Sequence, residues 1–454
     1  MNRWLAAACD YIPQWLELQV RANDQPGCVL AIAHRGEVVL DRAFGVADVP
    51  RGTPLTPRHR FRVASHSKTF TAAGVMRLRE MRRVRLDAPV GKYVSGLHRT
   101  IAETTLRELL SHGAGISRDG PDSGQWALER PFLSTDELTR DLKEPRVIDR
   151  GSRLKYSNHG YGLLGLVIAQ VTGTPYAKWI ARNVVAEAGL GATYPDVPVP
   201  RGVPMAHGHT MRRTFGERRT LGSDLPTHGM ASATGFVSTA RDLVAFFQQL
   251  DPAATKSFLG VPSRREMTRF HRSVPGIPAG REYGLGVARG RLGDWRWFGH
   301  SGSFPGYLTR TAVVPSARLA ISLLTNAVDG PSQLWMDGVL GILQTFAKRG
   351  APTAATRRWT GRWWTLWGAT DLVGVGSRVL LATPALTHPF VGAGELVVRG
   401  DRGTIVAADG YATYGETAAL TRGRGGVATE LRLGGGTLLP EKELRARTRR
   451  RLNR

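Results

Sequence analysis

The sequence is poor in cysteine, in lysine and in long apolar runs. Cys9 and Cys28 are the two cysteines among 454 residues, and neither has a CxxC neighbour. This excludes a disulfide framework and argues against a structural zinc site, so we expect both thiols to be free and buried. No run approaches the roughly 18 apolar residues that a membrane-spanning helix needs, so the sequence predicts a soluble protein without a membrane partner.

The N-terminal residues lack the features of a secretory signal. The apolar stretch 4–9 is shorter than the apolar core of such a signal, and Asp10 ends it. Residues 4–22 instead have the spacing of an amphipathic helix, with one apolar face formed by Leu5, Ala8, Trp15 and Leu18. We therefore expect a cytoplasmic protein.

The formal charge is +25, which raises the question of nucleic-acid binding. Eight of the 62 basic residues are lysines, and the arginines are scattered along the whole chain rather than gathered in one segment. The dense cluster is the short tail 445–454, which we expect to be solvated. This distribution is typical of a compositional bias, and the sequence does not predict a dedicated nucleic-acid partner.

The chain is long enough for more than one domain, and 42% hydrophobic residues suit a globular protein. Strand-like segments occur at 28–33 and 36–40, and again at 295–300, 308–314 and 319–325. Helical patterns lie between them, at 65–83, 161–172 and 240–250, and another follows at 333–348. The first domain, residues 1–348, is therefore predicted to be α+β, with one sheet built from both ends of the segment and a helical region inserted.

A second domain is predicted after a small, polar linker at 349–356. Residues 357–445 contain short alternating strands separated by glycine and aspartate, which favours a small all-β, barrel-like domain. Its first residues include Trp359, Trp363, Trp364 and Trp367, for which packing is the favoured interpretation and a ligand platform the alternative. Residues 446–454 form the basic tail.

Ser65 and Lys68 form the first candidate catalytic pair. If Ser65 begins the helix at 65–83, Lys68 lies on the same face about one turn later, within reach of the serine hydroxyl. A lysine with its ordinary pKa of about 10.4 would need burial or nearby positive charge to act as a base at neutral pH. A second SxxK, Ser152–Lys155, lies in a glycine-flanked loop with no helical run behind it, so we favour the first pair.

Two further motifs supply polar groups suited to a cleft. Tyr156 and Asn158 can point the same way from a loop or extended segment, where the phenol can relay protons and the amide can orient a substrate or the lysine. His300, Ser301 and Gly302 end a strand-like segment: Gly302 would let a substrate backbone approach, and His300 would offer a donor or a positive charge. Alone, each motif is more simply read as an ordinary loop or turn.

The order and context of these motifs resemble the serine β-lactamase-like hydrolases, the group that includes class C β-lactamases, DD-peptidases, D-aminopeptidases and related esterases. The resemblance covers most of residues 24–348 and includes the segments at 61–72, 106–116, 156–165 and 238–243. It implies a β-lactamase/transpeptidase-like fold, with a five-stranded antiparallel sheet flanked by helices and an all-helical region beside the cleft.

The resemblance also implies roles for individual residues. Ser65 would form an acyl-enzyme, Lys68 would be the base and Tyr156 would carry protons to the leaving group and activate water. Asn158 would position Lys68 and substrate, and His300 would stabilise the anionic site. The backbone N–H groups of Ser65 and Ser303 would form the oxyanion hole, beside Ser301 and Gly302 as substrate-binding positions.

The expected function is hydrolysis of small esters, peptides or amides, including those with D-amino acids, without a cofactor or a metal. Many β-lactamases of this group carry lysine where this chain has His300, which favours esterase or peptidase activity. The alternatives are a β-lactamase or DD-carboxypeptidase and, in another class, a non-catalytic binding or assembly module. The pair His207 and His209 is interpreted as a loop feature rather than a metal site.

Overall fold

The computed structural model describes residues 1–276, 280–408 and 413–452. Two compact units can be separated: a central unit, residues 25–336, and a terminal unit made of residues 1–24 and 337–454. These units do not coincide with the ranges predicted from the sequence, because the N-terminal helix α1 (Arg3–Ala22) groups with the C-terminal part of the chain.

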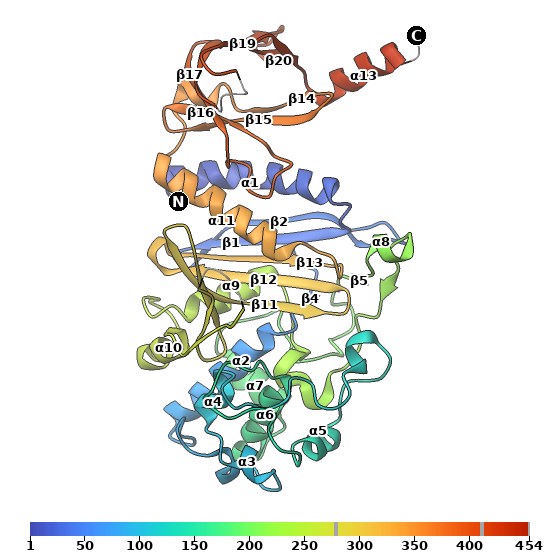
Figure 1. The fold of residues 1–454 in the computed structure, drawn as a ribbon, viewed down its shortest axis with the longest axis vertical. Helices are drawn as coiled ribbons and strands as arrows, with labels where there is room; N and C mark the ends of the chain where they lie inside the picture. Colours follow the sequence, from blue (N-terminus) through green and yellow to red (C-terminus); the bar gives the residue numbers. More distant parts are fainter. Residues whose placement is uncertain (277–279, 409–412, 453–454) are drawn as a thin grey trace. The chain divides into compact units, whose positions relative to one another are not determined.

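The central unit is organised around an antiparallel sheet (Figure 1). In spatial order its strands are β3 (Thr53–Pro54), β2 (Glu37–Asp48), β1 (Gly27–His34), β13 (Leu319–Thr325), β12 (Tyr307–Val314), β11 (Trp295–Phe304), β10 (Ala288–Leu292), β9 (Glu282–Tyr283) and β8 (Arg272–Ser273). Cys28 pairs with Thr325 and His34 with Leu319, so strands from both ends of the segment are neighbours, as predicted. The five expected strands are the long central ones, and short strands extend both edges.

Every residue of β1 is buried, which explains its continuous apolar sequence without polar alternation. Helix α9 (Ala240–Gln249) packs on β1, β12 and β13, and the predicted helix at 240–250 is thereby confirmed. Thr239 caps α9 by accepting the Asp242 N–H, but the Asp242 carboxylate turns to Ala192 and Thr193 instead of completing a capping box.

Helices and loops between β3 and β10 form the helical region (Figure 1). Its helices are α2 (His66–Glu80), α3 (Arg99–Ala102), α4 (Leu106–Leu110), α5 (Thr135–Asp141), α6 (Asn158–Thr172), α7 (Tyr176–Ile180), α8 (Arg212–Phe215), α9 and α10 (Val261–Thr268). Two small ladders join β4 (Phe61–Arg62) to β7 (Val237–Ser238) and β5 (Gly208–His209) to β6 (Thr220–Leu221). Helices α2 and α6 contact each other, and their N-terminal ends carry the predicted site motifs.

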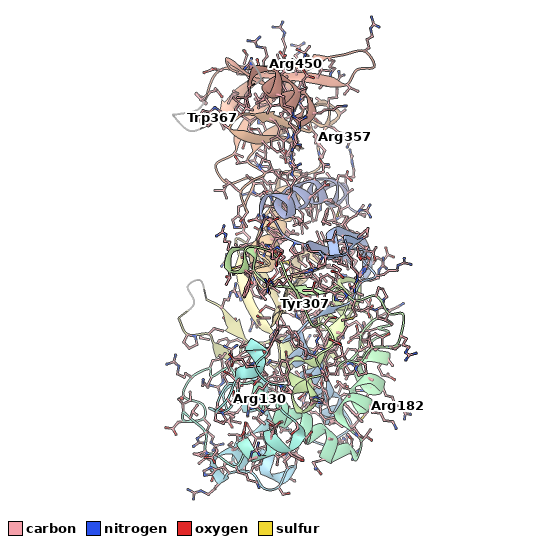
Figure 2. All side chains as sticks on the ribbon, turned by 90° about the vertical axis from the view of Figure 1, so that its right-hand side faces the viewer. Arg130, Arg182, Tyr307, Arg357, Trp367 and Arg450 are labelled. Atoms are coloured by element: carbon pink, nitrogen blue, oxygen red, sulfur yellow. The ribbon has the colours of Figure 1, made fainter. Side chains whose placement is uncertain are left out.

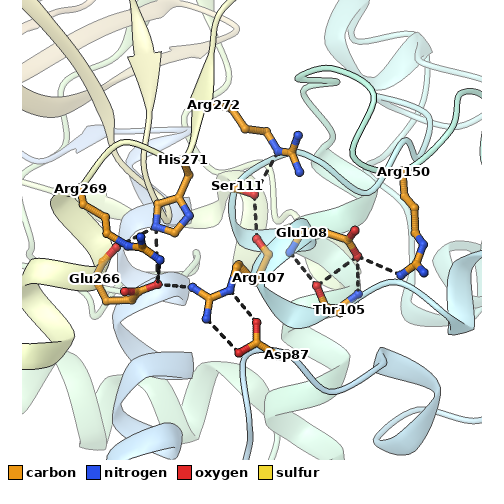
Figure 3. Close-up of polar contacts among 10 residues, drawn as sticks. All are labelled: Asp87, Thr105, Arg107, Glu108, Ser111, Arg150, Glu266, Arg269, His271 and Arg272. Carbon is orange, nitrogen blue, oxygen red and sulfur yellow. Dashed lines mark hydrogen bonds and ion pairs between the residues drawn. The ribbon is translucent and has the colours of Figure 1, made fainter.

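A polar network holds helix α4 in place (Figure 3). Thr105 and Glu108 form a reciprocal capping box at its N-terminus. Arg107 pairs with Asp87, whose carboxylate accepts from Nε at 2.6 Å, and with Glu266. This arrangement fixes the segment that leads from α4 to His112, which lies beside the candidate site.

The terminal unit contains a meander of antiparallel strands: β14 (Gly361–Thr365), β15 (Gly368–Val375), β16 (Arg378–Ala382), β17 (Gly394–Arg399), β18 (Arg402–Ala407), β19 (Thr417–Arg422), β20 (Ala428–Leu433) and β21 (Gly436–Leu438). A bridge between Trp364 and Leu439 joins the first and last strands, so the sheet closes as a barrel. The barrel-like prediction is confirmed; strands β14 and β19–β21 were not anticipated.

Helix α1 packs within the terminal unit. The Trp15 indole donates to the Leu386 carbonyl at 3.2 Å, and the Gln19 amide donates to the Pro384 carbonyl at 2.7 Å. The unit also contains α12 (Ala354–Arg357), most of α11 (Ser332–Arg349) and α13 (Glu441–Leu452). Helix α13 holds most of the predicted basic tail and has no buried residue; positions 453–454 of that prediction lie outside the described residues.

The tryptophans of the terminal unit divide between core and surface. Trp359 and Trp363 are buried in the barrel core, as the packing interpretation expects, whereas Trp367 is 99% exposed at the turn between β14 and β15 (Figure 2). The arginines labelled in Figure 2 come from different parts of the chain, in keeping with their scatter in the sequence. Both cysteines are free and buried, as predicted. Among the described residues, no helix has the length and apolar character needed to span a bilayer.

Candidate active site

A cleft of about 730 Å³ in the central unit brings the predicted site residues together. Its lining includes Ser65, Tyr156, Asn158, His300, Ser301, Gly302 and Ser303. Lys68 is fully buried beneath this surface and reaches Ser65 from within α2. These residues come from the start of α2, the start of α6 and strand β11, which are distant in the sequence.

A tight turn presents Ser65 at the N-terminal end of α2. Ala64 has φ +48°, a left-handed conformation that costs a non-glycine residue about 1 kcal/mol or more. Ser67 holds this turn, because its hydroxyl donates to the Ala64 carbonyl at 2.5 Å and accepts from the Phe236 N–H at 2.9 Å. Ser65 is thereby left half-buried at the helix N-terminus, facing the cleft.

Lys68 lies one turn beyond Ser65, with its amine surrounded by three acceptors. Nζ donates to Ser65 Oγ at 3.1 Å, to Asn158 Oδ1 at 2.7 Å and to the Ala233 carbonyl at 2.8 Å. Burial lowers the pKa of Lys68 well below its ordinary value, an effect that Asp119 opposes and Arg118 reinforces. A neutral amine in this position can donate to the two carbonyl oxygens and turn its lone pair toward the serine hydroxyl.

The Tyr156 ring lies over the lysine amine, with 4.8 Å between Nζ and the ring centre. Burial raises the pKa of Tyr156 above its ordinary value, although a hydrogen bond with Ser65 acts in the opposite direction. The phenol is therefore protonated at neutral pH and can donate at the serine. His112 packs against the same ring with 4.1 Å between ring centres and the planes tilted by 36°, and it accepts the Ser157 N–H, which fixes the start of the YSN segment.

Asn158 connects Lys68 to the carboxylate of Asp119, which was not predicted from the sequence. Its Oδ1 accepts from Lys68, and its Nδ2 donates to Asp119 Oδ1 at 2.5 Å. Asp119 follows the SHGAGIS segment in an irregular loop, where no local spacing relates it to the SxxK or YxN motifs. Only the fold reveals its proximity to the site.

His300 differs from the expectation drawn from the sequence. The ring is 3% exposed; Nδ1 contacts the Ser301 carbonyl at 2.7 Å, and Nε2 contacts the Tyr283 hydroxyl at 2.8 Å. Because a carbonyl can only accept, Nδ1 carries the proton and Nε2 of the neutral ring accepts from the tyrosine. Burial, together with the neighbouring His66, lowers the pKa of His300 well below its ordinary value. The side chain therefore presents neither a positive charge nor a free donor to the cleft.

Gly302 also has a different role from the one expected. A Cβ at this position would lie 2.2 Å from the Val63 carbonyl oxygen, so the glycine lets β11 approach the segment that leads into Ser65. The close approach is by the protein's own backbone rather than by a substrate. This close approach places Ser303 in the wall of the cleft that also contains Ser65. The backbone N–H groups of these two serines were expected to form the oxyanion hole.

The second SxxK has none of this geometry. Ser152 is exposed in a loop, and its hydroxyl donates to the Asp149 carbonyl at 2.5 Å. The pair His207 and His209 was interpreted from the sequence as a loop feature. In the structure both ring nitrogens of His209 contact the backbone: Nε2 accepts from the Val49 N–H, and Nδ1 contacts the Asn326 carbonyl.

Three arginines on the cleft wall were not anticipated. Arg118, Arg281 and Arg310 line it from two loops and strand β12, and the carboxylate of Glu282 is also present. Arg310 is 1% exposed and stacks on Trp297, with 4.2 Å between its guanidinium carbon and the ring centre. The positive charge of the cleft therefore comes from these arginines and not from His300.

Solved structures of known proteins resemble the fold of this chain. The D-amino acid amidase from Ochrobactrum anthropi in complex with D-phenylalanine superposes with a TM-score of 0.65 at 26% identity, covering 74% of this chain and 99% of the amidase. The octameric penicillin-binding protein homologue from Pyrococcus abyssi superposes with a TM-score of 0.67 at 21% identity, covering 95% and 99% of the two chains. At that identity the second comparison supports the fold.

A curated relative, protein flp from Staphylococcus aureus, is 28% identical over 180 residues, which are 38% of this chain and 35% of the relative. The chain thus matches about a third of the length of that relative. The family model described as Beta-lactamase matches residues 14–336, which include the whole central unit and the second half of α1. The chain belongs to the Beta-lactamase family of serine hydrolase-like proteins.

Proposed function

We propose that this protein is a serine hydrolase that forms an acyl-enzyme at Ser65 and acts on small esters, peptides or amides, including those with D-amino acids. The observation that carries this proposal is the 3.1 Å contact between Lys68 Nζ and Ser65 Oγ in a buried setting that lowers the pKa of the lysine. The structural likeness to a D-amino acid amidase supports the choice of substrate class.

In the first step, Lys68 accepts the Ser65 proton as Oγ attacks the substrate carbonyl carbon. Negative charge develops on the carbonyl oxygen, which the backbone N–H groups of Ser65 and Ser303 would stabilise at the α2 N-terminus. Tyr156 then donates its phenolic proton to the leaving group and recovers a proton from the Lys68 ammonium. Expulsion of the leaving group leaves an ester between Ser65 and the acyl group.

In the second step, water attacks this ester. Tyr156 and Lys68 together remove a proton from the water, and Ser65 Oγ leaves and takes a proton back. Asn158 holds Lys68 through the cycle by accepting from its amine. His300 contributes the shape of the cleft wall and the orientation of Tyr283, since both of its ring nitrogens are already occupied.

A second candidate function is β-lactamase or DD-carboxypeptidase activity. Its support is the set of arginines on the cleft wall, which can attract the carboxylate that such substrates carry. The neutral His300 weakens this candidate, because the position offers no fixed cation next to Ser301 and Gly302.

A panel of three substrates separates these functions: a nitrophenyl ester, a D-amino acid amide and a chromogenic cephalosporin. We expect kcat/KM to be highest for the ester or the amide, and the Ser65→Ala variant to be inactive on every substrate. Cephalosporin turnover above that of the other two would establish the second candidate. An absence of Ser65-dependent turnover across a broad ester and amide set would instead favour a non-catalytic binding module.

A further inference from the structure

Asp119 is a nearly buried carboxylate in contact with Asn158, and its contacts converge on the catalytic machinery proposed above. Oδ1 accepts from Asn158 Nδ2 at 2.5 Å and from the Trp126 indole at 3.0 Å. Oδ2 lies 3.1 Å from Arg118 Nε. The side chain is therefore held by two hydrogen-bond donors and one ion pair, and one of the donors is the amide that also contacts Lys68.

The backbone around Asp119 is fixed to the start of α6. The Asn158 N–H donates to the Arg118 carbonyl at 2.8 Å, and the Ser157 hydroxyl donates to the Ser117 carbonyl at 2.6 Å. The segments that carry Asp119 and Asn158 are thus joined by hydrogen bonds next to the contact between these two side chains. This geometry leaves little freedom for Asp119 to move away from Asn158.

The direction of the Asn158 amide decides what Lys68 encounters. With Oδ1 toward the lysine, the amine donates to Asn158 and to Ala233, and its remaining site faces Ser65 Oγ. With the amide reversed, an NH₂ group would face the amine and that arrangement would be lost. A carboxylate can only accept, so Asp119 selects the first orientation.

We propose that Asp119 is a positioning residue that fixes the Asn158 amide with its oxygen toward Lys68 and so aims the lysine lone pair at Ser65. This proposal rests on the proposed function. It adds a fourth residue to the series of contacts that begins at the serine: Ser65, Lys68, Asn158 and Asp119.

The charge of Asp119 should affect the pH dependence of acylation, which a role in packing alone would not. The titratable and charged side chains around the Lys68 amine are His112, Arg118, Asp119, Tyr156, Tyr161 and His300. Asp119 is the carboxylate in this set, and its charge raises the pKa of Lys68 against the larger effect of burial. Removing that charge should lower the pKa further and move the acid limb of the acylation rate to lower pH.

The test measures the rate of Ser65 labelling by a fluorophosphonate probe as a function of pH, with thermal unfolding of each full-length variant recorded in parallel. Asp119→Asn can keep an oxygen toward Asn158 and Trp126, so we expect a near-normal plateau rate with the acid limb at lower pH. Asp119→Ala also loses the acceptor, and we expect the plateau rate to fall about ten- to a hundredfold. The control is Asp122→Asn, which removes a carboxylate three residues away that pairs with Arg130 and should change neither quantity.

The outcomes distinguish a failure of the Asp119 proposal from a failure of the proposed function. If wild type is labelled at Ser65 and both Asp119 variants match it in rate and pH profile, the positioning proposal is overturned alone. If Asp122→Asn shifts the acid limb as far as Asp119→Asn, the effect is one of general charge and the proposal also fails. A folded wild type that is never labelled at Ser65 overturns the proposed function together with this proposal.

Discussion

Replacing Lys68 with methionine removes the amine but keeps an unbranched side chain of similar length in a fully buried position. We expect the rate of fluorophosphonate labelling at Ser65 to fall by about 10²- to 10⁴-fold, the usual contribution of a positioned base. The matched control is Lys155→Met, which alters the half-buried lysine of the second SxxK, whose Ser152 is exposed, and should leave the rate unchanged.

The same variant should have a pH-dependent effect on stability. Burial lowers the pKa of Lys68 in the folded protein, whereas the unfolded chain has the ordinary lysine value of about 10.4. Between these two values the unfolded chain binds a proton that the folded protein does not bind. The free energy of unfolding of wild type should therefore rise with pH, by up to about 1.4 kcal/mol per pH unit from this group, and lose that increment as pH falls.

Lys68→Met lacks this titration, so the stability of wild type relative to the variant should increase as pH rises toward the ordinary lysine pKa of about 10.4. A constant offset of about 1–3 kcal/mol per unsatisfied acceptor is also expected, because Asn158 Oδ1 and the Ala233 carbonyl lose their donor. Chemical denaturation at several pH values measures both effects. Labelling of Lys68→Met at the wild-type rate, or an equal loss in Lys155→Met, would refute the assignment of the base.

Three further predictions address other parts of the molecule. Tyr156→Phe should lower kcat for a nitrophenyl ester by about 10²- to 10⁴-fold, since the phenol acts in proton transfer, and should lower KM as well, because slowed deacylation lets the acyl-enzyme accumulate; an unchanged kcat would remove Tyr156 from the mechanism. His300→Lys should raise the ratio of cephalosporin to ester turnover by about tenfold through one charge-assisted hydrogen bond, and a ratio that stays constant would show that this position does not select carboxylates. Trp359→Phe should destabilise the terminal unit by about 1–3 kcal/mol in chemical denaturation, because the Gly400 carbonyl loses its 2.9 Å bond from the indole, and an unaltered midpoint would contradict this.

The sequence predicted the elements that have a strong local pattern. The apolar run at 28–33 and the helical spacing at 65–83 correspond to β1 and α2, since hydrophobic periodicity and burial act over a few residues. The choice of Ser65 over Ser152 rested on the helix behind it, and the structure shows that helix and an exposed loop at the two positions. The short strands β8–β10 were not anticipated, because two to five residues are too few to distinguish a strand from a loop, and β19–β21 of the barrel were also missed.

The site was only partly accessible from the sequence. Its serine, lysine, phenol and amide stand in recognisable motifs, whereas Asp119 acts through a contact that only the fold creates. The charge of His300 also could not be predicted from the sequence pattern, because burial and the two hydrogen bonds of the ring determine it. The compartment, the absence of a nucleic-acid partner and the natural substrate stay predictions.

The proposed mechanism requires that Ser65 becomes covalently acylated during turnover. Mixing Tyr156→Phe, in which we expect deacylation to be slowed, with a nitrophenyl ester and recording the intact mass tests it directly. We predict a mass increase equal to the acyl group, mapped to the peptide that contains Ser65 and absent from a Ser65→Ala background. No adduct in either wild type or Tyr156→Phe while ester is being consumed, or an adduct on Ser152, would contradict it.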